Sequence, residues 1–93
     1  MNKIEARGLL EEFLDGLKTW SREELLGCLN NPVCLEKTGK SGTVYQIEAQ
    51  AVWDSQEGGD LRIIASIDDG GFLSALVPVS AGFLVTPSGE TID

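Results

Sequence analysis

The chain has 93 residues, a hydrophobic fraction of 42% and a formal net charge of −8. A chain of this length folds as one domain with a single core between two layers. Its acidity argues against binding nucleic acid or an anionic membrane through phosphate groups, and the absence of histidine removes the commonest general base and zinc ligand. No apolar run approaches the roughly 20 residues of a membrane span, and residues 1–7 lack the apolar stretch of a signal peptide, so we expect a cytoplasmic protein.

Two helices are predicted at the N-terminus. Over residues 2–17, apolar side chains recur every three or four positions, and Asn2 is a suitable N-cap. The second helix, over residues 22–30, begins with a capping box formed by Ser21 and Glu24. Pro32 ends it, because the residue before a proline is pushed out of the helical region.

Four strands are predicted to follow, at about residues 43–53, 61–67, 72–77 and 83–86. Over residues 43–53, Tyr45, Ile47, Ala49, Ala51 and Trp53 alternate with more polar side chains, so this apolar set faces the helices. Residues 33–35 form a brief extended segment, and residues 36–42 form a polar loop. The pattern predicts an α+β fold, with two N-terminal helices packed on one face of a three- to four-stranded antiparallel meander sheet.

The sequence Asp68-Asp69-Gly70-Gly71 predicts a tight turn between the strands 61–67 and 72–77. A two-residue turn would pair Ile67 with Phe72 and Ile63 with Leu76. A three-residue turn with a bulge would pair Ile67 with Leu73 and Ile63 with Val77, and this register is favoured because it places more apolar side chains on the core side. Residues 78–82 are predicted to bend, and residues 91–93 to form a tail.

Negative charge is concentrated in the sheet half of the chain. Residues 41–93 contain eight acidic residues and one base, Arg62, which gives this half a net charge of −7. Such a field steers a basic protein partner toward the surface, although it also serves solubility alone. We predict a partner-binding surface made of Glu48, Asp54, Glu57, Asp60, Asp68 and Asp69.

The sheet face turned away from the helices is predicted to carry apolar side chains. Val44, Val52 and Ile64 project there, and too few helices are available to cover both faces. This favours a homodimer or a partner surface through that face or through an exposed strand edge. The alternative is a solvated sheet that tolerates scattered aliphatic residues.

The residues that could carry chemistry have simpler structural explanations. Asp68 and Asp69 could perform acid–base work or bind a hard cation, but aspartate is also a preferred turn residue. Cys28 and Cys34 are predicted to be buried free thiols, too few for a zinc site. We predict a non-enzymatic protein with no cofactor and no metal; the alternative function is a small-ligand pocket between helices and sheet, lined by Tyr45 and Trp53.

Residues 62–72, residues 78–80 and residues 87–89 resemble a set of small uncharacterised bacterial α+β proteins that share the Asp-Asp-Gly-Gly turn. These proteins occur as stand-alone genes and in mobile gene cassettes, and some are immunity-like. The resemblance covers roughly residues 43–90 and rests mostly on turn-forming residues. It implies a non-enzymatic bacterial accessory protein, for example one that neutralises a toxin.

Overall fold

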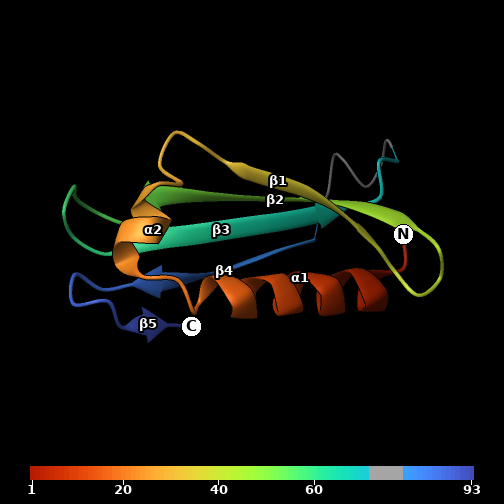
Figure 1. Ribbon diagram of the computed structural model, residues 1–93, viewed down its shortest axis with the longest axis horizontal. Helices are drawn as coiled ribbons and strands as arrows, with labels where there is room; N and C mark the ends of the chain where they lie inside the picture. Colours follow the sequence, from red (N-terminus) through yellow and green to blue (C-terminus); the bar gives the residue numbers. More distant parts are fainter. Residues whose placement is uncertain (72–78) are drawn as a thin grey trace.

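A five-stranded antiparallel sheet dominates the computed structural model, which describes residues 1–71 and 79–93 (Figure 1). Each strand pairs with its neighbours in sequence, so the predicted meander and the α+β class are confirmed. The sheet has more strands than predicted, because residues 33–38 and 91–92 also join it. The strands are β1 (Val33–Thr38), β2 (Val44–Trp53), β3 (Leu61–Asp68), β4 (Val79–Val85) and β5 (Thr91–Ile92).

One long helix, α1 (Lys3–Leu17), lies along one face of the sheet (Figure 1). The Asn2 side chain caps it by accepting a hydrogen bond from the Glu5 backbone N–H at 3.1 Å, as predicted. Its buried stripe packs against β3 and β4 and consists of Ala6, Leu10, Leu14 and Leu17. Burial of this stripe holds the two layers together.

The second helix, α2, is shorter than the predicted range of residues 22–30 and spans Arg22–Leu26. The predicted capping box is present, with reciprocal bonds between Ser21 and Glu24. The helix ends early because Gly27, Cys28 and Leu29 donate to carbonyls only three residues back, which tightens the chain into turns. Asn30 then adopts a φ of 58°, a left-handed conformation that reverses the chain toward β1.

β1 and β5 were not predicted as strands, and each is held in the sheet by backbone pairing with its neighbour, β2 or β4. β1 pairs with β2 over six residues, and the Gly39 N–H donates to the Thr43 carbonyl at 2.9 Å where the hairpin turns. β5 pairs Thr91 and Ile92 with the end of β4, so the predicted C-terminal tail is part of the sheet.

The predicted pairing of β3 with residues 72–77 is wrong. Ile67 pairs with Ile47 of β2 on one side and Val79 of β4 on the other, so neither Phe72 nor Leu73 is its partner. Ile63 pairs with Ala51 and Phe83, which excludes the partners Leu76 and Val77. The predicted strand 72–77 lies outside the described residues.

Residues 79–82, predicted as a bend, belong to β4. A Cβ at Gly82 would collide with the backbone carbonyl of Ile63 in β3. Glycine is therefore required here by the close approach of two backbones rather than by a turn. Asp68 and Asp69 do act as turn residues, since their carboxylates accept the N–H groups of Gly70 and Gly71 at 2.8 and 3.0 Å.

The predicted alternation of the central strands is confirmed. On β2 and β3 the helix-side residues are buried, with the partial exception of Trp53, and their chain neighbours are exposed or half-buried. Because α1 packs on β3 and β4, the β1 side of the sheet is less covered. This offset leaves a groove between α1 and β1. The sheet face opposite α1 is the other candidate surface for binding.

Candidate functional site

The first surface is the sheet face opposite α1, which we call the open face. Antiparallel register sets the order of its side chains: Gln46 of β2 lies opposite Glu36 of β1 on one side and Asp68 of β3 on the other. Two residues further along β2, on the same face, Glu48 lies opposite Cys34 of β1 and Ser66 of β3. Glu36, Glu48 and Asp68 therefore surround Gln46, and we call these four residues the acidic half of the open face.

Neutral donors, not bases, satisfy the carboxylates of the acidic half. The Gln46 side-chain amide donates to Glu36 Oε1 at 3.2 Å, and the Gly70 N–H donates to Asp68 Oδ1. The Cys34 thiol lies 3.9 Å from Glu48 Oε2. No salt bridge to these three carboxylates is found among the described residues, so their charge is available to a partner.

The other end of the open face is apolar around one arginine. Arg62 lies in a row between Val52 and Leu84, and Ile92 of β5 follows Leu84. Asp54 neutralises the arginine: its Oδ1 accepts from Arg62 Nε at 2.8 Å and from Nη2 at 2.6 Å. We call Val52, Ile64, Leu84 and Ile92 the apolar half of the open face.

The predicted dimer residues Val44, Val52 and Ile64 all lie on the open face, but they do not form one patch. Val44 and Val52 are 45% and 38% exposed at opposite ends of β2. Eight residues at the rise of a strand separate them by roughly 26 Å. Ile64 groups with Val52 in the apolar half, whereas Val44 stands beyond the acidic half.

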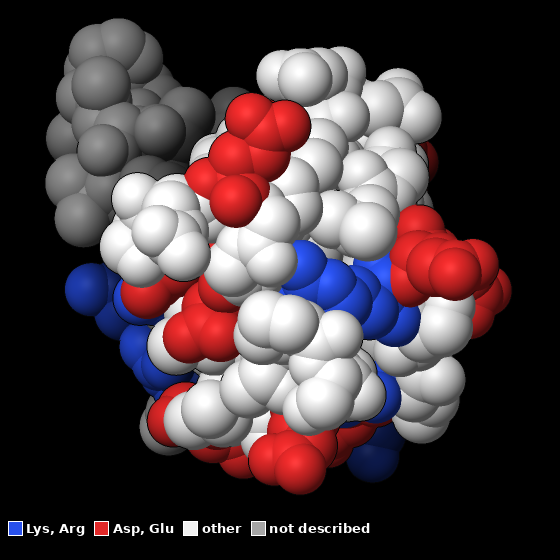
Figure 2. Space-filling view, turned by 90° about the vertical axis from the view of Figure 1, so that its left-hand side faces the viewer, with Lys and Arg blue, Asp and Glu red and all other residues white. Residues whose placement is uncertain are grey.

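The six predicted acidic residues are also divided. Asp54, Glu57 and Asp60 lie in the β2–β3 loop, whereas Asp68 is the last residue of β3 and Asp69 follows it, roughly 23 Å away by strand rise. Asp69 forms an ion pair with the N-terminal amino group of Met1 at 3.5 Å. Figure 2 shows the end of the molecule with the β2–β3 loop, where acidic side chains form separate groups around a short basic stripe.

Only Glu48 and Asp68 of the predicted set therefore belong to the acidic half, and Glu36 was missed. Residues 36–42 were predicted as a loop because Glu36, Lys37 and Thr38 are polar. The alternation of Val33 and Leu35 with Cys34 and Glu36 is the signal that could have identified a strand there.

Tyr45 and Trp53 do not share a ligand pocket. Tyr45 is fully buried, and its hydroxyl donates to Glu5 Oε1 at 2.8 Å. Trp53 is half-buried at the other end of β2, where the Arg22 guanidinium lies 5.7 Å from its ring centroid. Each aromatic residue thus links one end of β2 to a helix: Tyr45 to α1 and Trp53 to α2.

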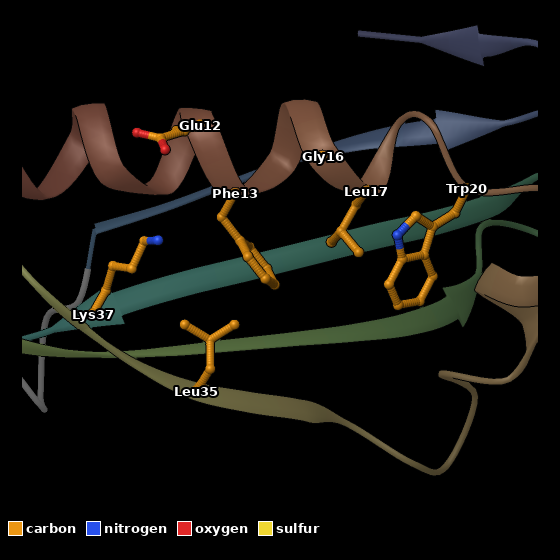
Figure 3. A pocket seen from close by; sticks show the side chains of 7 residues that line it. All are labelled: Glu12, Phe13, Gly16, Leu17, Trp20, Leu35 and Lys37. Atoms are coloured by element: carbon orange, nitrogen blue, oxygen red, sulfur yellow. The ribbon is translucent and has the colours of Figure 1, made fainter.

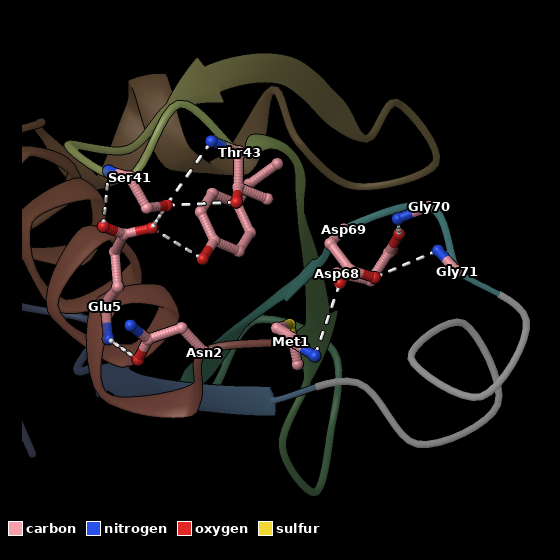
Figure 4. A network of polar contacts seen from close by, with 10 residues as sticks. Met1, Asn2, Glu5, Ser41, Thr43, Asp68, Asp69, Gly70 and Gly71 are labelled. Carbon is pink, nitrogen blue, oxygen red and sulfur yellow. Dashed lines mark hydrogen bonds and ion pairs between the residues drawn. The ribbon is translucent and has the colours of Figure 1, made fainter.

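Glu5 is the centre of a polar network that the sequence did not predict. Besides Tyr45, it accepts from the Ser41 hydroxyl at 2.6 Å and from the Ser41 N–H at 3.1 Å (Figure 4). The bonds from Ser41 and Tyr45 lower the pKa of the Glu5 carboxyl, and burial together with the Glu5 bond raises the pKa of Tyr45. The network ties the first turn of α1 to the β1–β2 hairpin.

The second surface is an open hollow of about 280 Å³ between α1 and β1, which we call the groove. Phe13 and Leu17 of α1, together with Trp20, point toward Leu35 of β1 (Figure 3). Glu12 and Lys37 add one charge of each sign at the same end. The groove is therefore mostly apolar, and neither Tyr45 nor Trp53 lines it.

The two cysteines are free thiols in different environments. Cys28 is buried, as predicted, and burial raises its pKa. Cys34 is exposed, because it points to the open face, so the prediction that it is buried is wrong. Within residues 1–71 and 79–93, no group of three or more potential ligands could hold a metal ion, and no helix is long and apolar enough to cross a membrane.

Comparison of the chain with protein-family models, curated proteins and solved structures finds no match. The resemblance to small bacterial gene-cassette and immunity-like proteins therefore stays a prediction.

Proposed function

We propose that the chain is a non-enzymatic interaction protein that binds a basic protein partner through the acidic half of its open face. The observation that supports this most directly is the charge arrangement on that face. Glu36, Glu48 and Asp68 lie on three adjacent strands, and the only base on the described part of the face, Arg62, is already paired with Asp54.

The surroundings of the acidic half suit association. The net charge of −8 attracts a basic partner over long range and raises its rate of encounter. The apolar half lies on the same face, and exposed Val52 and Ile92 offer surface that a partner can remove from water. Charge thus supplies steering and apolar burial supplies affinity.

Neutralising a cationic toxin or nuclease is one role that fits this surface and the predicted resemblance. A homodimer through the apolar half remains a second prediction, and light scattering at high concentration distinguishes a 10.0 kDa monomer from a dimer.

The test compares two variants with the same net charge. One carries Glu36→Gln, Glu48→Gln and Asp68→Asn; the control carries Glu11→Gln, Glu23→Gln and Glu90→Gln, three acids outside the open face. Each is titrated calorimetrically with a lysine-rich protein at low and high salt. We expect wild type and control to bind with affinity that falls as salt rises, and the first variant to bind about tenfold more weakly, as expected for the loss of charge pairs. Equal weakening of both variants, or binding indifferent to salt, would contradict the proposal.

A further inference from the structure

We propose that the outer edge of β1 and the groove beside it bind an extended segment of the partner in which apolar and basic residues alternate. The segment would add a sixth strand to the sheet. This inference rests on the proposed function and specifies which part of a basic partner the domain recognises.

The first step concerns the backbone of β1, which is the last strand on its side of the sheet. The Gly39–Thr43 pair is joined by a hydrogen bond, and in an antiparallel ladder every second pair is joined in this way. Residues 37, 35 and 33 therefore turn their N–H and C=O groups toward β2. Cys34, Glu36 and Thr38 turn theirs outward, where no described strand meets them.

The second step concerns the helix side of that edge. A strand added there would point every second side chain toward α1, next to Leu35 and into the groove. The groove is lined there by Phe13, Leu17 and Trp20, and Trp20 is 39% exposed. These positions of the bound segment are therefore expected to be apolar.

The third step concerns the open-face side. The intervening side chains of the added strand would lie beside Cys34, Glu36 and Thr38, with Glu48 on the next strand. Opposite charges on adjacent strands stabilise pairing, whereas like charges oppose it. These positions are therefore expected to be lysine or arginine, which gives the segment its period of two.

A second copy of the chain fits this edge less well than a basic segment. Two-fold pairing of β1 centred on residue 36 would place Glu36 opposite Glu36 of the second copy, and any register brings together two chains that each carry −8. The opposite end of the sheet is a poorer template, because β5 contains only Thr91 and Ile92.

The experiment uses a ten-residue peptide of alternating lysine and valine, and a block peptide in which the same lysines and valines are separated into two runs. Binding to the full chain is followed by tryptophan fluorescence and by hydrogen exchange of the backbone amides. We expect the alternating peptide to bind more tightly than the block peptide and to protect the amides of Cys34, Glu36 and Thr38. Equal binding of the two peptides overturns the inference.

Two substitutions at one position separate backbone from charge. Glu36→Pro removes an outward N–H, which an edge strand tolerates because that group makes no bond within the sheet. Glu36→Pro is expected to lower the affinity for the alternating peptide about five- to tenfold more than Glu36→Gln, which keeps the N–H. Thermal unfolding checks that both variants are folded. If Glu36→Pro does not fold, the protection of the amides of Cys34, Glu36 and Thr38 in the wild-type chain decides.

The remaining outcomes distinguish this inference from the proposed function. If Glu36→Pro binds like Glu36→Gln while the Glu36, Glu48 and Asp68 variant loses affinity for basic proteins, the open face binds partners but the β1 edge does not. If light scattering shows a dimer that Glu36→Pro dissociates, the edge serves a second copy and the inference is wrong.

Discussion

On β3, the chain neighbours Ile63 and Ile64 lie on opposite faces of the sheet. Ile63 is 1% exposed beneath α1, whereas Ile64 is half-buried on the open face beside Gln50 and Gly82. The covered face is held by hydrophobic burial, and no buried polar residue is found among the described residues. The open face has surplus carboxylates instead. The covered face is therefore expected to carry most of the stability, and the open face is the surface proposed for binding.

The largest expected effect tests this difference directly. Ile63→Ala should lower the free energy of unfolding by about 3 kcal/mol, because it leaves a cavity in the core. Ile64→Ala should lower the free energy of unfolding by about 1 kcal/mol, because Ile64 is half-buried and its truncation leaves no enclosed cavity. Urea denaturation measures both. Similar losses would mean that the open face is covered in solution.

A second pair compares Arg22 of α2 with Arg62 of β3. Arg22 donates to the carbonyls of Val85 and Gly59 at 3.2 and 2.8 Å and lies over Trp53. Nη2 of the same guanidinium also lies 3.4 Å from the Gly58 carbonyl oxygen. Arg22→Ala should therefore cost about 2 kcal/mol, from the loss of these hydrogen bonds and of the cation–π contact.

Arg62→Ala is the matched control on the open face. It removes only the exposed pair with Asp54 and should cost less than about 1 kcal/mol. Chemical denaturation of both variants gives the comparison. A larger loss for Arg62→Ala would show that the open face contributes to stability.

A smaller effect depends on pH and concerns Glu5. Its folded-state pKa is lowered from the ordinary value of 4.5, so its stabilising contribution is present above that value and is lost as pH falls through the folded pKa. Glu5→Gln should be less stable than wild type at neutral pH. The difference should shrink below pH 4.5.

Thermal unfolding at neutral and acidic pH measures this change, and Glu11→Gln, on an exposed part of the same helix, is the control. A difference that stays constant down to acidic pH would show that the network of Glu5, Ser41 and Tyr45 does not favour the carboxylate.

The smallest effect on stability is expected for Cys34→Ala on the open face, within about 0.5 kcal/mol. The two thiols should nevertheless differ in reactivity. Cys34 should react with a thiol reagent in the native protein, whereas Cys28 should react only on unfolding, because it is buried and its pKa is raised. Mass spectrometry after native labelling decides, and rapid labelling of Cys28 would show that the core beneath α2 opens.

Local patterns were sufficient for the fold class, for α1 with its Asn2 cap, for the capping box at Ser21 and for the alternating faces of β2 and β3. In each case the deciding interaction lies within one strand period or one helical turn. The alternation of residues 43–53 also places Glu48 on the face opposite Tyr45 and Ile47. Asp68 was predicted as a turn residue, and it joins that face because β3 extends to Asp68.

Tertiary structure decided the partners of β3, the inclusion of β1 and β5 in the sheet, and the grouping of the carboxylates. Strand pairing joins residues that are distant in sequence, so a turn signal such as Asp69-Gly70 does not specify which strand follows as the partner. Glu36 joined Glu48 and Asp68 only once β1 had a place beside β2. The groove likewise exists only because α1 packs over β3 and β4. The position of α1 is set by side-chain packing between helix and sheet, which no single segment specifies.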